Sequence, residues 1–114
     1  MIGKLSTHVL DLTTGRPAAG MTIRLSRLGD FPAVIATVTT NADGRTDAPL
    51  LTAEAMQAGT YELVFFVKDY FTGGGVACSF LDEVPVRFVI TDPQAGHHVP
   101  LLVTPWAYQT YRGS

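Results

Sequence analysis

Residues 97–114 read HHVPLLVTPWAYQTYRGS, and this stretch decides the fold. Its first half alternates between two sets of side chains, with Val99 and Leu101 on one face, a period of two that is typical of a β-strand. Pro105 interrupts the alternation, and an aromatic-rich run follows at 106–111. Two short runs joined at a Thr-Pro predict a hairpin at the end of a β domain.

Several strand-like runs precede this hairpin, separated by turn-forming glycine, proline, asparagine and aspartate residues. They lie at 6–12, 21–28, 33–40, 61–68 and 84–91. One helical turn is predicted just after Thr52, a candidate N-cap. With the final hairpin, the pattern gives about seven or eight strands and no strand–helix–strand rhythm, which predicts an all-β, antiparallel two-sheet sandwich with at most one short helix.

Composition limits the function classes. The 114 residues and the 46% hydrophobic content are those of one domain with a real core, spanning 1–114. The net charge of −2 argues against a surface for nucleic acid or for an anionic membrane. The longest apolar runs, such as 63–67, have the length of a strand, so we expect no membrane-spanning helix.

The compartment is predicted from the first residues and the single cysteine. A strand pattern follows Lys4 at once, which leaves no room for a cleavable apolar signal, so we expect a cytoplasmic protein. Cys78 is the one cysteine, which excludes an internal disulfide and fits a reducing compartment. Cys78 could be a nucleophile, but a lone cysteine between apolar neighbours is more often a small buried hydrophobe.

Three histidines are the first candidates for chemistry. His97 and His98 are neighbours on a strand and therefore face opposite ways, and His98 shares its face with Leu102. In the first strand, His8 lies opposite the face of Val9. These are either surface or hydrogen-bonded histidines, or the parts of one shared site. Alternation alone does not show whether the two outward faces meet.

Arg45 is the second kind of candidate. It directly follows the turn sequence Asn-Ala-Asp-Gly at 41–44. Most arginines in such positions are solvated. The alternative is an anion clamp, because arginine stays charged and offers a planar fork of donors that suits a delocalised oxyanion.

The chain resembles the 5-hydroxyisourate hydrolases, the transthyretin-like proteins of purine catabolism. Four segments carry the resemblance, in the family's order: LSTHVLD, TNADGR, FLDEVPVRF, and the HVPLL strand with its Thr-Pro turn and terminal YRGS. They lie at 5–11, 40–45, 80–88 and 98–114. The resemblance covers nearly the whole chain and implies a transthyretin-like fold. The family has a short helix where this chain carries Gly-Gly-Gly at 73–75, and glycine's poor helix propensity predicts that the helix is shortened or absent.

The resemblance implies that His8, Arg45 and His98 form the catalytic set of a hydroxyisourate hydrolase. Opening a cyclic acyl-urea needs a water made nucleophilic near neutral pH, and imidazole has the pKa that suits this task. It also needs positive charge where the tetrahedral oxyanion develops. One histidine, His8 or His98 rather than His97, then activates water while the other polarises or orients, and Arg45 binds substrate and stabilises the oxyanion.

The resemblance also implies that the terminal tetrapeptide lines the same pocket and contacts the substrate. Its residues are Tyr111, Arg112, Gly113 and Ser114. Zinc is a further question wherever histidines gather, but the sequence offers no third ligand at a convincing spacing, and neither a metal nor another cofactor is expected. No nucleophile-elbow motif is present either, and Gly-Gly-Gly lacks the lysine of a phosphate loop.

Assembly is predicted from the outward face of His98, Pro100 and Leu102, which is too apolar for plain solvent. The resemblance implies a homotetramer, a dimer of dimers, with paired active sites in the channel between the dimers. Trp106 and Tyr108 are candidates for core or edge positions, and the sequence favours packing in the core.

Two other readings of the sequence stay open. The first is a transthyretin-like protein that binds or transports a small aromatic ligand without catalysis, and the second is a structural β-sandwich with a sticky face. Transthyretin lacks both the terminal tetrapeptide and the histidines at these places, so the resemblance favours the hydrolase branch.

Overall fold

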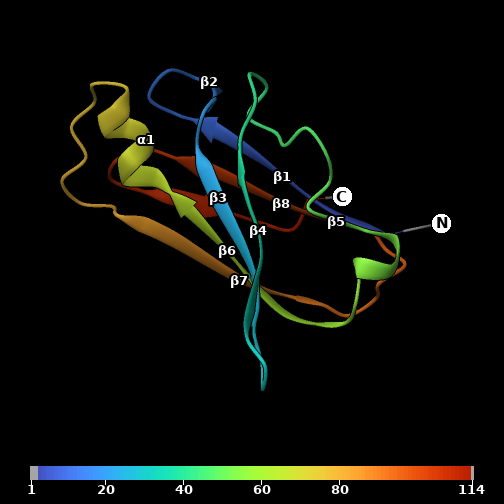
Figure 1. Ribbon diagram of the computed structural model, residues 1–114. Helices are drawn as coiled ribbons and strands as arrows, with labels where there is room; N and C mark the ends of the chain where they lie inside the picture. Colours follow the sequence, from blue (N-terminus) through green and yellow to red (C-terminus); the bar gives the residue numbers. More distant parts are fainter. Residues whose placement is uncertain (1–2, 114) are drawn as a thin grey trace.

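The computed structural model describes residues 3–113, which form two β-sheets packed face to face, with one short helix at one end of the sandwich (Figure 1). The first sheet has the strand order β2-β1-β8-β9, with β5 also paired to β1, and the second has the order β4-β3-β6-β7. The strands are β1 (Lys4–Asp11), β2 (Arg16–Pro17), β3 (Thr22–Arg27), β4 (Ala33–Thr39), β5 (Leu51–Thr52), β6 (Gly59–Phe66), β7 (Glu83–Ile90), β8 (His97–Val103) and β9 (Tyr108–Thr110). A 3₁₀ turn, η1 (Ala53–Ala55), follows β5, and the helix α1 (Val67–Gly73) follows β6.

Alternation along the strands builds the core. Every second residue of β1 and of β8 is buried between the sheets, and the residues between them face outward. The inward positions are Leu5, Thr7, Val9 and Asp11 on β1, and His97, Val99, Leu101 and Val103 on β8. Strand β6 lies inside the second sheet and contributes Tyr61, Leu63 and Phe65 to the same core. The two-sheet sandwich predicted from the sequence is confirmed.

The pairing of β1 with β8 differs from the antiparallel sheet that the sequence predicted, because these two strands run parallel. Every other strand pair is antiparallel. A short turn can join only antiparallel neighbours, and parallel neighbours need a long crossover. Here the entire second sheet lies between β1 and β8 along the chain, so no turn dictates their relative direction.

The helix is present at 67–73 and ends at the first of the three glycines, so the prediction that it could be absent is wrong. Gly73 is its last residue, and the hydrogen bonds that follow close its end: the N–H of Gly75 donates to the carbonyl of Thr72, and the N–H of Val76 to the carbonyl of Phe71, 2.9 Å away. This is the pattern of a Schellman cap, in which glycine is the preferred residue after the helix. The strand predicted at 61–68 corresponds to β6. It ends at Phe66, because the helix begins at the next residue, Val67.

Other predictions from the sequence meet mixed outcomes. Cys78 is buried, as expected, and its thiol lies 3.2 Å from the carbonyl oxygen of Leu81. Thr52 is the N-cap residue of η1, but its side chain makes no capping hydrogen bond.

The prediction that Trp106 and Tyr108 pack in the core is wrong, because they are 64% and 46% exposed. Trp106 sits on the turn between β8 and β9 and stacks on the exposed ring of Phe80, with 6.3 Å between ring centroids.

The turn before Arg45 is fastened to the edge of β1. The side chain of Asn41 accepts hydrogen bonds from the N–H groups of Asp43 and Arg45, and so shapes the turn locally. The N–H of Val9 donates to the carbonyl of Gly44, 2.8 Å away. Gly44 has φ +73°, and a Cβ at this position would collide with the carbonyl oxygen of Val9. Glycine therefore allows both the turn and its close contact with β1.

Replacing Gly44 with alanine tests this contact. Gly44→Ala should lower the free energy of unfolding by about 2–5 kcal/mol, because a left-handed alanine costs about 1–2 kcal/mol and overpacking adds about 1–3 kcal/mol. Gly15→Ala is the matched control, since Gly15 has φ +71° with open space around it and carries only the backbone cost. Urea unfolding at one fixed protein concentration measures both. Equal losses for the two variants would contradict the close contact.

Candidate active site

The outward face of the first sheet holds His98 against β1. The parallel register places Ser6 beside His98 and His8 beside Pro100. Both histidines and Ser6 are half-buried, and the Oγ of Ser6 lies 2.9 Å from the Nδ1 of His98, within hydrogen-bond distance. The structure thus answers the question that alternation left open, because the outward faces of the first and eighth strands are contiguous.

His8 is the next outward residue of β1 after Ser6, and it lies diagonally across from His98. Two residues along a strand and one strand across correspond to roughly 8 Å between Cα atoms. Side chains at such diagonal positions can reach a common small ligand. His97 points the other way, is 6% exposed, and its Nδ1 lies 3.1 Å from the carbonyl oxygen of Ala95.

Arg45 approaches the same face from the edge of β1 that faces away from β8. Its turn is held at Val9, and its side chain is exposed. Arg45 and Ser6 line a shallow hollow of 210 Å³. Burial, followed by the positive charges of Arg45 and His8, lowers the pKa of His98 below its usual 6.5. His98 is therefore neutral at pH 7, and the two charge effects place both partners within electrostatic reach of its ring.

The C-terminal segment closes the other side of His98. Gly113 pairs with His98 in an isolated antiparallel bridge, and its N–H donates to the carbonyl of His98, 2.8 Å away. A Cβ on Gly113 would lie 2.6 Å from the Cδ2 of the His98 ring, closer than real Cβ contacts come. The imidazole therefore packs directly on the backbone of the tail, and only glycine leaves it room.

The rest of the predicted tail set lies elsewhere or outside the described residues. Tyr111 and Arg112 line a groove of 310 Å³ between β7 and the end of β8, together with the inward-facing His97. Arg112 also donates from Nη2 to the carbonyl of Gly96, 3.1 Å away. The structure brings Gly113 to His98, whereas Tyr111 and Arg112 contact this neighbouring groove, and Ser114 lies outside the described residues.

Ser6 is the site residue that sequence reasoning missed. Its signal was present, because Ser6 and His8 are successive outward positions of the same strand. What the sequence lacked was the pairing of β1 with β8, which alone puts the hydroxyl beside His98.

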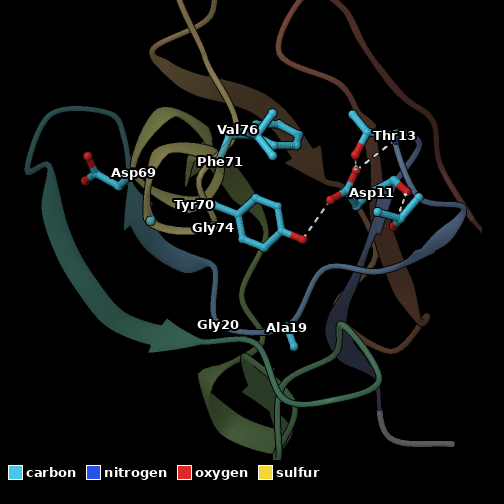
Figure 2. A pocket seen from close by; sticks show the side chains of 11 residues that line it. Asp11, Thr13, Ala19, Gly20, Asp69, Tyr70, Phe71, Gly74 and Val76 are labelled. Atoms are coloured by element: carbon cyan, nitrogen blue, oxygen red, sulfur yellow. Dashed lines mark hydrogen bonds between the residues drawn. The ribbon is translucent and has the colours of Figure 1, made fainter.

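A second hollow lies beside α1 and is separate from this face (Figure 2). It measures 530 Å³, and its lining includes Asp11 and Tyr70 but none of His8, Arg45 and His98. The hydroxyl of Tyr70 donates to Oδ2 of Asp11, 2.8 Å away, while Oδ1 accepts from the N–H and the hydroxyl of Thr13. Burial and the Asp11 carboxylate raise the pKa of Tyr70 to about 12. The pair is therefore a satisfied link between α1 and the end of β1.

Residues 3–113 contain no group of three or more His, Cys, Asp or Glu side chains placed to hold a metal ion. They also contain no helix long and apolar enough to cross a membrane.

The arrangement can carry acid–base chemistry on an anionic or carbonyl-bearing ligand. A neutral imidazole offers one donor and one acceptor, and two imidazoles next to a permanent cation can move a proton and stabilise a developing oxyanion. A small planar molecule could contact His8, His98 and Arg45 together from the outward side of the sheet.

Comparison with known proteins agrees with this geometry. The sequence profile described as the HIUase/Transthyretin family matches residues 5–113, and the chain belongs to this family. Over 96% of its length it is 50% identical to the 5-hydroxyisourate hydrolase of Deinococcus radiodurans, and over 98% it is 53% identical to 5-hydroxyisourate hydrolase 2 of Rhizobium meliloti. The match covers 95% and 97% of those two proteins.

A solved structure extends the comparison to the fold. The crystal structure of (S)-allantoin synthase superimposes with a TM-score of 0.95 at 42% sequence identity and covers 99% of this chain. The chain spans 44% of the length of that protein. The crystal structure of sea bream transthyretin superimposes with a TM-score of 0.88 at 28% sequence identity, over 96% of this chain and 94% of that one, which confirms the transthyretin-like sandwich predicted from the sequence.

Removing the charge of Arg45 tests the electrostatic link within the site. Arg45→Gln should raise the pKa of His98, because a neighbouring cation disfavours the imidazolium. NMR titration of the imidazole signals measures this pKa directly. Arg24→Gln is the matched control, since Arg24 lies on β3 of the other sheet, over the ring of Phe66. A pKa of His98 that is the same in Arg45→Gln and in the wild type would contradict the assigned proximity.

Proposed function

We propose that this protein hydrolyses 5-hydroxyisourate to 2-oxo-4-hydroxy-4-carboxy-5-ureidoimidazoline, a step of urate degradation in purine catabolism. The observation that carries the proposal is the half-buried His98, which lies diagonally across from His8 on the outward β1–β8 face and whose pKa is lowered by burial and then by the nearby Arg45. The substrate is a small, planar, acidic heterocycle, so a pocket of this charge fits it. The family relatives named as 5-hydroxyisourate hydrolases support the same activity.

In this proposal, His8, Arg45 and His98 are the catalytic residues. One histidine takes a proton from the attacking water and the other donates to or orients the substrate, which a neutral imidazole near pH 7 can do. Arg45 binds the substrate and stabilises the tetrahedral oxyanion with its planar donors. Gly113 bounds the pocket through its contact with His98. Substrate contacts by Tyr111, Arg112 and Ser114 remain part of the proposal on the ground of the family resemblance alone, since Tyr111 and Arg112 line the neighbouring groove. No cofactor takes part in the proposed chemistry.

Three substitutions test the catalytic set. His8→Ala and His98→Ala should each lower kcat about 10²–10⁴-fold by removing proton transfer, and Arg45→Ala about 10²–10³-fold by removing oxyanion stabilisation. The measurement is the ultraviolet decay of 5-hydroxyisourate, generated in the cuvette by oxidising urate, against its spontaneous rate. His97→Gln is the control, because His97 faces the core and glutamine can also donate to the carbonyl of Ala95.

The outcome also separates the two branches of the family. A folded wild-type protein that leaves the decay rate unchanged would contradict the hydrolase proposal and favour a transthyretin-like ligand carrier. Equal activity in the wild type, His8→Ala and His98→Ala would show that catalysis occurs elsewhere.

We further propose that the chain acts as one domain over 1–114 and assembles as a homotetramer, a dimer of dimers. Apolar surface of two kinds, one half-buried and one exposed, supports this assembly. Leu10 and Leu102 are paired neighbours on the outward face of β1 and β8, beside the site. Val89 on the edge strand β7 is 56% exposed, and Tyr108 on the edge strand β9 is 46% exposed. A face contact and an edge contact together would generate a closed assembly, with the active sites between its halves.

Sedimentation velocity at the assay concentration tests the assembly. We expect the wild type to sediment as four chains, and Leu102→Glu to sediment as a smaller species with reduced activity, because a buried carboxylate disfavours the face contact. Leu12→Glu is the control: Leu12 is 48% exposed and lies just beyond the end of β1. A fully active monomer of the wild type would overturn this part of the proposal.

The cytoplasm is the proposed compartment. Its support is the chemistry of Cys78, which is a free, buried thiol of the kind that persists under reducing conditions.

A further inference from the structure

We infer that Ser6 is a positioning residue that fixes the tautomer of His98, donating its hydroxyl proton to Nδ1 so that the ring presents Nε2–H to the substrate. The inference rests on the proposed hydrolase function for its catalytic meaning, but its structural part can be measured without substrate. The 2.9 Å distance between the Oγ of Ser6 and the Nδ1 of His98 carries it.

The backbone fixes both partners of this contact. Ser6 and His98 form the second of the seven residue pairs of the β1–β8 ladder, and a paired residue on each side of them holds the main chain of both strands. At such a position the strand backbone sets the direction in which the Cβ of each residue points. The hydroxyl of Ser6 therefore stays within reach of one particular ring nitrogen.

The tail limits movement of the ring on the side opposite β1. A Cβ built on Gly113 would lie 2.6–3.1 Å from Cδ2, Cβ and Cγ of His98, so the Gly113 backbone lies close beside the side chain. The bridge between Gly113 and His98 holds that backbone in place. Ser6 and Gly113 thus hold the ring between two neighbouring strands of the sheet.

Charge decides the direction of the hydrogen bond. Ser6 lines a hollow with the cations Lys4 and Arg45 and the carboxylate Asp47, so the hydroxyl lies in a field in which positive charge predominates. A cation attracts the oxygen end of the hydroxyl dipole and repels its hydrogen. The proton of Ser6 therefore points away from Arg45 and toward Nδ1 of His98. A neutral imidazole that accepts at Nδ1 carries its own proton on Nε2.

This tautomer assigns the two histidines their separate roles. An Nε2–H group can donate a hydrogen bond to a carbonyl or a developing oxyanion, but it cannot accept a proton from water. His98 therefore polarises the substrate alongside Arg45. Proton transfer from the attacking water is then left to His8, which lies beyond Ser6 on the same strand.

Two substitutions at one position test the inference. Ser6→Ala removes the hydroxyl, and Ser6→Thr keeps a hydroxyl on the same carbon. ¹⁵N NMR of the histidine rings distinguishes the protonated from the unprotonated nitrogen, and steady-state assays separate kcat from KM. We expect the wild type and Ser6→Thr to show His98 as the Nε2–H tautomer. Ser6→Ala should show a mixture of tautomers, and its kcat should fall about 10–100-fold, since a misplaced catalytic group can cost about 10²-fold, with KM changed less than twofold.

Ser26→Ala is the matched control, because Ser26 is a half-buried strand serine in the other sheet. It should leave both the His98 tautomer and kcat at the wild-type values. A wild-type protein with the proton on Nδ1 of His98 would overturn the inference. So would a Ser6→Ala protein that keeps both the wild-type tautomer and the wild-type kcat. If the wild type does not hydrolyse 5-hydroxyisourate, the proposed function fails, and the NMR spectra alone then decide what Ser6 does to His98.

Discussion

The parallel ladder between β1 and β8 is the constraint on which the rest of the site depends. It joins the first and the eighth strand of the chain, and its register decides which outward side chains meet. A slip by one residue would move His98 from the outward face into the core, because side chains alternate along a strand. Burial of Leu5 and Val9 on β1 and of Leu101 on β8 opposes such a slip. Burying such a side chain contributes about 1.5–3 kcal/mol, so the apolar face of each strand stabilises the polar arrangement on the other.

Two segments then converge on this ladder from different parts of the chain. The turn that ends in Arg45 docks through Gly44 on the edge of β1 that faces away from β8, between the stretches paired with β5 and β2, and the tail docks on the far side of β8 through Gly113. Both contacts depend on a missing Cβ, since a methyl group would collide with the carbonyl of Val9 in one case and with the ring of His98 in the other. Glycine at positions 44 and 113 thus lets two stretches of backbone come close to β1 and β8. These contacts bring the Arg45 turn and the tail to the face that carries His98.

Much of this could be predicted from the sequence, and the limits have physical reasons. Period-two alternation predicted where the strands lie and that His98 and His97 face opposite sides of one strand, because this signal is local in the sequence. It could not give the direction of β1 against β8, which depends on a crossover through the whole second sheet. Ser6 was overlooked for the same reason, since its partner is 92 residues away. Trp106 was expected in the core from its hydrophobicity. It lies at the surface because it is on the short turn between β8 and the edge strand β9. The resemblance to a known family supplied the roles of His8 and Arg45, which no local pattern could distinguish from those of solvated side chains.

The central claim is that His8 and His98 act as one unit in one site. A double-mutant cycle on kcat/KM for the decay of 5-hydroxyisourate, with His8→Ala, His98→Ala and the double variant, tests it most directly. Residues that act together lose most of the rate enhancement when either one is removed. We predict that the double variant is no more than a few-fold slower than the slower single variant. Two losses that multiply in full, as for independent sites, would contradict a shared site on the β1–β8 face.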